Sequence, residues 1–62
     1  MKINEFVRDY SKNGKINIYD RSTYMAHSFH NKEKAIYEMG YYSVLQWNIK
    51  NDEVLIITQS QF

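Results

Sequence analysis

Cysteine and proline are both absent from this 62-residue sequence. Without cysteine, the fold has neither a disulfide nor a cysteine-ligated zinc site to stabilise it. A chain this short buries only about 60% of the surface that its unfolded form exposes, so its core must be densely packed or completed by self-association. The sequence therefore predicts one small domain over 1–62, stabilised by apolar packing to which many aromatic residues contribute.

The chain also lacks an excess of charge of either sign. Eight basic residues stand against seven acidic ones, which gives a net charge of +1. This balance excludes an acidic mimic of nucleic acid. It gives little support to a general phosphate binder, because such proteins concentrate positive charge on one surface.

Long apolar runs are missing as well. The opening segment MKINEFVRDY carries charges at positions 2, 5, 8 and 9, which interrupt any signal-peptide core. The longest aliphatic run, Val54–Ile57, is far shorter than the roughly 20 residues that span a membrane. We therefore expect a cytoplasmic protein with no membrane partner.

Two segments carry apolar residues at the three- and four-residue spacing of a helix. The first helix is predicted over 3–12, and Asn13-Gly14 after it is typical of a helix that ends in a left-handed conformation. The second is predicted over 32–39, between Asn31, a favoured N-cap, and Gly40, a favoured stop signal.

Four further segments have the alternation or the β-branched composition of strands, namely 15–20, 23–29, 43–49 and 53–58. The turn at 50–52 joins the last two as a hairpin, and the final four residues are expected to fray. The order α-β-β-α-β-β predicts an α+β fold, with a four-stranded, mainly antiparallel sheet and two helices packed on one face.

The predicted core draws on the apolar stripes of these elements and contains Phe6, Ile18, Ile36, Leu45, Trp47 and Ile57. On this interpretation, replacing Phe6 or Trp47 with alanine costs about 3–5 kcal/mol.

The other face of the predicted sheet has no helix over it. Its candidate residues are Asn17, Tyr19, Val44, Gln46 and Asn48. A half-apolar open sheet suits docking or formation of a homodimer, although the same pattern suits an ordinary wetted sheet face.

Tyrosine is the residue type best suited to contact a partner protein, since it offers a large ring with a polar tip. Six tyrosines exceed what so small a core can hide. At least two of five are therefore expected to be exposed and to bind a partner, and these five are Tyr19, Tyr24, Tyr37, Tyr41 and Tyr42.

Motifs for catalysis are lacking. The sequence has no nucleophilic cysteine, no G-x-S-x-G turn and no glycine-rich phosphate loop. His27, His30 and Glu33 are of the types that bind zinc or iron, but no regular spacing brings them together, so no metal or other cofactor is expected. Asp52-Glu53 lies in a turn without a pocket to shift a pKa, so this pair is expected to be solvated. We expect no enzyme.

Nucleic-acid binding is the second functional interpretation. An open sheet with Tyr19 can stack on bases, while Lys12, Lys15 and Arg21 can contact phosphates. The near-zero net charge and the absence of an RNP-type aromatic motif weigh against it.

Lysine, asparagine, isoleucine and tyrosine supply 25 of the 62 residues, whereas arginine occurs only twice. All four have AT-rich codons, which indicates an AT-rich genome. In size, in composition and in its opening MKINEFVRDY, the chain resembles small phage and prophage proteins of low-GC Gram-positive bacteria. The resemblance implies an inhibitor that binds and blocks a host protein, as anti-CRISPR and other anti-defence proteins do. A structural subunit of a phage assembly is the third alternative.

Overall fold

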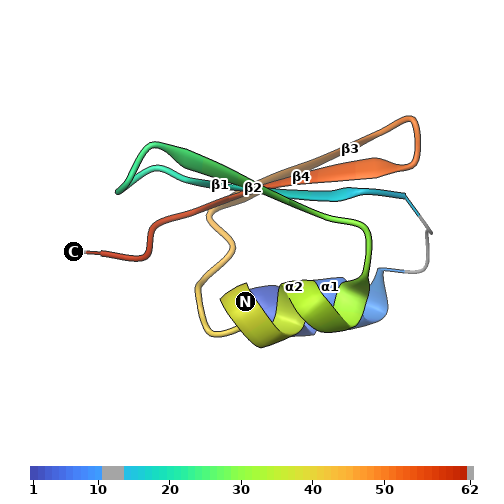
Figure 1. Ribbon diagram of the computed structural model, residues 1–62, viewed down its shortest axis with the longest axis horizontal. Coiled ribbons are helices and arrows are strands. Elements are labelled where there is room, and N and C mark those ends of the chain that lie inside the picture. The colour runs from blue at the N-terminus through green and yellow to red at the C-terminus, as the bar shows by residue number, and fades with distance from the viewer. Residues whose placement is uncertain (11–13, 62) are drawn as a thin grey trace.

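The computed structural model describes residues 1–10 and 14–61 of the chain. These residues form α1 (Ile3–Asp9), β1 (Ile16–Asp20), β2 (Met25–Phe29), α2 (Lys32–Met39), β3 (Gln46–Lys50) and β4 (Glu53–Thr58). The sheet forms one layer and both helices form the other, on the same side of the sheet (Figure 1). The predicted α+β fold and its element order are confirmed.

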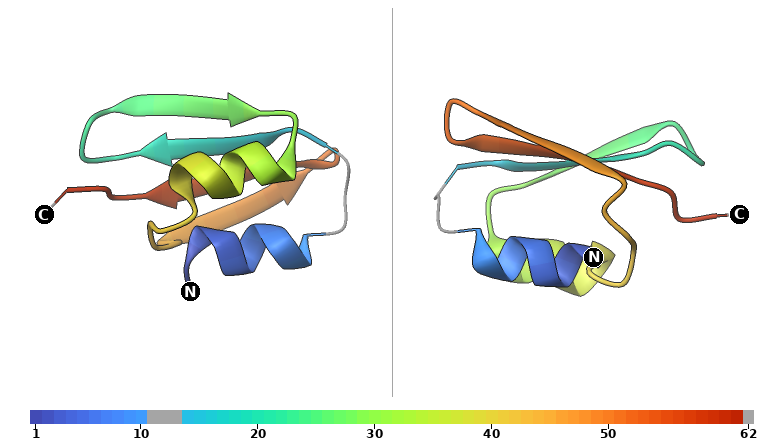
Figure 2. Two further views of the ribbon diagram at one scale, coloured as in Figure 1. Left: turned by 60° about the horizontal axis from the view of Figure 1, so that its bottom comes forward. Right: turned by 180° about the vertical axis from the view of Figure 1, so that it is seen from behind.

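The strand order in the sheet is β2-β1-β4-β3, so β2 and β3 are its two edges (Figure 2). The β1–β2 and β3–β4 pairs are antiparallel, whereas the central β1–β4 pair is parallel. The sheet is thus mainly antiparallel, as predicted. Its single parallel pair arises because the second hairpin returns to the sheet through α2, and such crossover connections join parallel strands.

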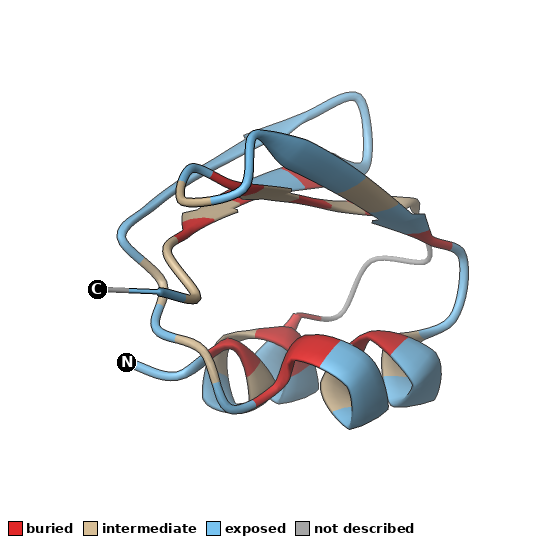
Figure 3. Ribbon diagram, turned by 60° about the vertical axis from the view of Figure 1, so that its left-hand side comes forward, coloured by how far each residue is buried: buried red, intermediate tan, exposed pale blue. Residues whose placement is uncertain are grey.

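The core lies between the two layers, where the buried residues face one another (Figure 3). The parallel register places Ile16 beside Val54 and Ile18 beside Ile56, and all four side chains are buried. From the helices, Ile3, Val7, Ala35 and Met39 complete this core. The predicted burial of Ile18 is confirmed.

Two residues of the predicted core are not buried. Leu45 is 45% exposed and Trp47 is 57% exposed. The predicted face is right for Trp47, which lies opposite the buried Ile56, whereas Leu45 precedes β3. Burial fails because β3 is an edge strand, which α1 covers in part, through contact of the Phe6 and Trp47 rings at 5.3 Å between centroids.

Three other predicted core residues, Phe6, Ile36 and Ile57, are half-buried. Ile57 alternates with the buried Ile56 and therefore lies on the opposite, open face of the sheet. Val44 was predicted for that open face, but it precedes β3 and packs against the core.

The helix ends depart from the sequence prediction. α1 ends at Asp9, and Asn13, the first half of the predicted stop signal, lies outside the described residues. Gly14 does not have a positive φ, so the left-handed conformation predicted there is wrong, whereas Gly40 is the C-cap of α2, as predicted. Close packing explains both glycines instead, because a Cβ on Gly14 would lie 1.4 Å from the Asp52 carbonyl oxygen.

The second helix begins as predicted. The side chain of Asn31 accepts a hydrogen bond from the Lys34 N–H at 3.0 Å, which satisfies one of the free donors of the first turn. The β3–β4 turn is also as predicted, since Asn51 and Asp52 adopt φ values of 53° and 64°. A two-residue turn with both φ values positive matches the twist of a hairpin.

Replacing Gly40 with alanine is expected to lower the free energy of unfolding by about 1–3 kcal/mol, the usual range for overpacking. The new Cβ would lie 2.4 Å from the Ile36 carbonyl oxygen and 3.0 Å from the Cβ of Asn4. The Asn4 N–H donates to the Gly40 carbonyl at 3.1 Å at this point. Denaturant unfolding measures the change, and Lys34→Ala on exposed helix surface is the control. An unchanged midpoint for the Gly40 variant would show that α1 and α2 separate there without cost.

Candidate interaction surfaces

Three tyrosines are strongly exposed, with Tyr37 at 86%, Tyr41 at 83% and Tyr24 at 81%. Tyr19 and Tyr42 are half-buried, and Tyr42 packs against the core. The prediction that at least two of these five tyrosines would be exposed is confirmed. Their predicted role in binding a partner stays a prediction.

Tyr37 and Tyr41 share the solvent side of α2 with Lys34. Ala35 and Met39 point into the core, so positions 34, 37 and 41 fall on the opposite side of the helix. The helical path continues through Gly40, with φ −64° and ψ −25°, which places Tyr41 about one turn beyond Tyr37. We call Lys34, Tyr37 and Tyr41 the α2 outer face.

Tyr24 belongs to a different surface. It closes the β1–β2 turn in the sheet layer, whereas α2 lies in the helix layer (Figure 1). Its φ of 59° is unusual for a residue with a side chain and costs about 1 kcal/mol or more. The five candidate tyrosines are therefore spread over the α2 outer face, a turn, the open sheet face and the core margin.

The open sheet face is half apolar, as predicted. Tyr19 and Ile57 lie on it half-buried, and Leu55 is 42% exposed. Polar residues surround them, and Asn17 accepts a hydrogen bond from the Ser28 hydroxyl at 2.9 Å. Hydrogen bonding among these side chains is also what an ordinary wetted sheet face shows.

The basic residues proposed to contact phosphates are dispersed. Lys15 precedes the first residue of β1 and Arg21 follows its last, so the strand separates them by about 20 Å. Lys12 lies outside the described residues. Of these residues, the two that the structure describes do not form a concentrated track of positive charge beside Tyr19.

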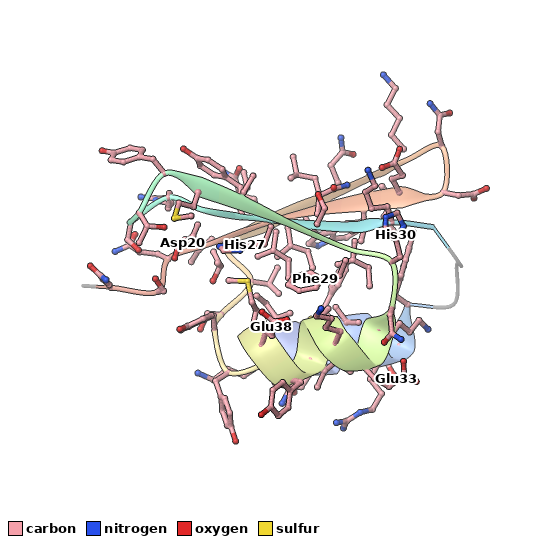
Figure 4. All side chains as sticks on the ribbon, in the orientation of Figure 1. Asp20, His27, Phe29, His30, Glu33 and Glu38 are labelled. Carbon is pink, nitrogen blue, oxygen red and sulfur yellow. The ribbon has the colours of Figure 1, made fainter. Side chains whose placement is uncertain are left out.

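The three potential metal ligands also lie apart. Figure 4 shows His27 on β2 well away from His30 and from Glu33 in the first turn of α2. Within residues 1–10 and 14–61, no group of three or more His, Asp or Glu side chains is placed to hold a metal ion. Zinc titration remains the direct test of the prediction that no metal binds.

The Asp52-Glu53 pair is exposed at the tip of the β3–β4 hairpin. The buried Tyr10 hydroxyl donates to the Asp52 carbonyl at 2.8 Å and so ties this turn to the end of α1. Burial, together with the negative charges of Asp52 and Glu53, raises the pKa of Tyr10. The Tyr10 hydroxyl therefore stays protonated and serves as a structural donor.

Asp20 forms a buried polar cluster that sequence reasoning missed. Its carboxylate is 3% exposed and accepts hydrogen bonds from the Ser22 hydroxyl at 2.6 Å and the Ser22 N–H at 3.0 Å. The Ser60 N–H donates to it at 3.2 Å, and the Ser60 hydroxyl donates to its other oxygen. These donors, those of Ser22 first, hold the pKa of Asp20 well below its ordinary value although burial opposes them.

This cluster also corrects the prediction of frayed C-terminal residues for 59–61, whereas Phe62 lies outside the described residues. Ser60 is bonded to Asp20, and the Gln61 N–H donates to the Ser22 hydroxyl at 3.1 Å. The Asp-x-Ser spacing at 20–22 is a sequence signal for a local turn. The contribution of Ser60, from the far end of the chain, has no such signal.

One further surface combines exposure with apolar character, and we call it the β3 edge. It comprises Trp47 and Ile49, which are 57% and 41% exposed on the helix side of an edge strand. The Phe6 ring of α1 contacts the Trp47 ring. Exposed apolar side chains grouped on one strand are typical of an interaction site.

Neither of the two helices in the described part of the chain has the length and apolar character needed to span a membrane. Comparisons with known proteins find no matching family model, no matching curated protein and no matching solved structure.

Proposed function

We propose that this chain is a non-catalytic protein-binding module whose α2 outer face covers a functional surface of a larger protein. The exposure of Tyr37 and Tyr41, each above 80%, carries the proposal. Both rings stand one helical turn apart and contribute little to the core, so the fold does not account for them.

The physical properties of this face suit binding. A tyrosine ring buries a large area against a partner, its hydroxyl forms a hydrogen bond at the rim, and few rotatable bonds are lost. The helix that carries Tyr37 and leads through Gly40 to Tyr41 is held by the Asn31 cap and by the buried Ala35 and Met39. The rings are therefore presented from a fixed backbone. Preorganisation of this kind lowers the entropic cost of association.

The mechanism in this proposal is occlusion. One copy of the module covers one copy of the partner's surface and needs no chemistry of its own. The composition resembles that of phage proteins, which favours a host protein as the partner and an anti-defence role in the host cytoplasm.

Binding is tested with the double variant Tyr37→Ala/Tyr41→Ala. A tagged chain captures its partner from a lysate of a low-GC Gram-positive host, and the captured protein is then purified for titration. The double variant is expected to bind it at least tenfold more weakly, a loss of about 1.4 kcal/mol. Circular dichroism confirms that the variant keeps its fold.

Tyr24→Ala is the matched control, because Tyr24 is equally exposed but lies in the β1–β2 turn. It is expected to bind like the parent chain. Equal binding by the parent and the double variant would remove the α2 outer face from the proposal. Capture that disappears after nuclease treatment would indicate nucleic acid as the primary ligand instead.

A further inference from the structure

The β2 strand is the edge of the sheet that lies beside α2 (Figure 2). Its sequence, Met-Ala-His-Ser-Phe, contains no proline, lysine, aspartate or glutamate, which are the residue types that usually protect an edge strand from pairing. The other edge is better protected. β3 begins beside a bulge, where Leu45 and Gln46 both lie opposite Ile57, and it ends at Lys50.

Hydrogen bonds at the two ends of β1 show which of its backbone groups face β4. The Arg21 N–H donates to the Thr58 carbonyl at 2.9 Å, and the Val54 N–H donates to the Lys15 carbonyl at 3.1 Å. Backbone groups two residues apart point to the same side of a strand. The odd-numbered positions of β1 therefore face β4, and its even-numbered positions face β2.

The pairing of β1 with β2 then defines the free groups of the edge. The even-numbered positions of β1 lie opposite Met25, His27 and Phe29, so these three residues direct their N–H and C=O groups into the sheet. Ala26 and Ser28 direct theirs outward. Within residues 1–10 and 14–61, no backbone group bonds to these outward groups. Two N–H and two C=O groups are therefore available to an added strand.

A cavity of about 270 Å³ lies on the helix side of this edge, between β2 and the C-terminal half of α2. Figure 4 places His27 and Glu38 on facing sides of it. The buried carboxylate of Asp20 also lines the cavity, and none of the described lining residues is a lysine or arginine. The side chains of Met25 and Met39 form its apolar part. The cavity thus combines an apolar wall with negative charge.

We propose that an extended segment of a partner protein pairs with β2 as a fifth strand and places a basic side chain in this cavity. The outward groups of Ala26 and Ser28 supply its main-chain hydrogen bonds. Alternate side chains of the added strand point to the helix layer. A lysine or arginine at such a position packs its aliphatic stem on Met25 and Met39 and brings its charge to Glu38.

Charge decides between this occupant and a second copy of the chain. Two copies that pair through β2 contribute only Met, Ala, His, Ser and Phe side chains to each other, so neither supplies a lysine or arginine. A twofold axis at His27 would bring the two imidazoles together and leave the acidic cavity without a cation. A partner segment with a basic residue satisfies both the backbone groups and the charge.

A synthetic peptide, acetyl-Thr-Val-Thr-Arg-Thr-Val-Thr-amide, tests this proposal on the purified chain. Titration followed by amide NMR is expected to give saturable shifts at Ala26 and Ser28, with a dissociation constant below about 1 mM. The same peptide with citrulline in place of arginine keeps the shape without the charge and is expected to bind about fivefold more weakly. Equal binding of the two peptides, or no saturable shift at β2, would overturn the proposal. Shifts at β2 that follow protein concentration without peptide would assign the edge to a second copy and overturn it as well.

Glu38→Gln tests the charge without a change in the strand. Glu38 is exposed, so the variant is expected to fold like the parent chain. It is expected to bind the arginine peptide about fivefold more weakly and the citrulline peptide equally well. Glu33→Gln is the matched control, because Glu33 is an exposed residue of the same helix that does not line the cavity. Equal losses in the two variants would contradict a specific contact with Glu38.

Ala26→Pro tests the pairing, because it removes an outward N–H and leaves every β1–β2 hydrogen bond in place. It is expected to abolish binding of both peptides. Ile49→Pro is the matched control at the other edge, since Ile49 lies opposite Val54, whose N–H faces β1, and so directs its own N–H outward. Binding by Ala26→Pro like that of the parent, or a loss only in Ile49→Pro, would overturn the proposal. Amide spectra verify that each variant folds, and Glu38→Gln decides the matter if Ala26→Pro does not.

This surface is separate from the α2 outer face, so the two proposals are tested separately. Tyr37→Ala/Tyr41→Ala is expected to bind the arginine peptide like the parent chain. A loss of peptide binding in this double variant would place the peptide on the α2 outer face and overturn strand addition at β2.

Discussion

Replacing Ile56 with alanine is expected to lower the free energy of unfolding by about 3–5 kcal/mol. Ile56 is fully buried in β4, a central strand, between Ile18 of β1 and Trp47 of β3. Its removal leaves a cavity that the surrounding strands cannot close. A chain of this size has a total stability of only about 3–9 kcal/mol, so the variant is expected to be largely unfolded at room temperature.

Trp47→Ala is the comparison variant for Ile56→Ala. Trp47 and Ile56 lie opposite each other in the same ladder, yet Trp47 is 57% exposed. Its replacement is expected to cost about 1 kcal/mol, mainly through the lost contact with Phe6. Urea unfolding followed by circular dichroism at low micromolar concentration measures both values. A Trp47 variant as unstable as the Ile56 variant would show that the β3 edge belongs to the core.

Replacing Asp20 with alanine is expected to cost about 2–4 kcal/mol, because hydrogen bonds to a charged acceptor are strong and their buried donors lose it. Ser22 and Ser60 would each keep a part-buried hydroxyl without this acceptor. The loss also frees the C-terminal residues from the β1–β2 turn. Thermal unfolding, together with protection of the Ser60 amide from hydrogen exchange, measures both effects.

The same carboxylate sets a dependence of stability on pH. The pKa of Asp20 is lower in the folded chain than in the unfolded one, so the unfolded state binds the proton more readily. Its contribution is therefore complete above the unfolded pKa of about 4 and is lost as the pH falls below it. Asp20→Asn is expected to be less stable near pH 7 and to lose less stability on acidification. Parallel pH profiles for the parent and this variant would assign the acid sensitivity to other groups.

The sequence by itself determined the local elements of this protein. Periodicity, together with the Asn31 cap and the Gly40 stop signal, placed α2 at 32–39, and the alternation of Ile16 and Ile18 identified the buried face of β1. Short-range physics suffices there, because side-chain spacing, capping and turn chemistry act within a few residues. The number of tyrosines relative to the core likewise predicted that some are exposed, although not which ones.

Tertiary structure alone decided how these elements are ordered in space. Trp47 and Ile56 are both apolar residues of predicted strands, and only the strand order makes one an edge residue and the other a central one. The same holds for Asp20, whose hydrogen-bond donor Ser60 lies 40 residues away in the sequence. It also holds for Gly14, whose backbone packs closely against the Asp52 carbonyl. Local patterns indicate which side of a strand faces the core, but burial depends on which segments become its neighbours, and contacts between distant parts of the chain determine that.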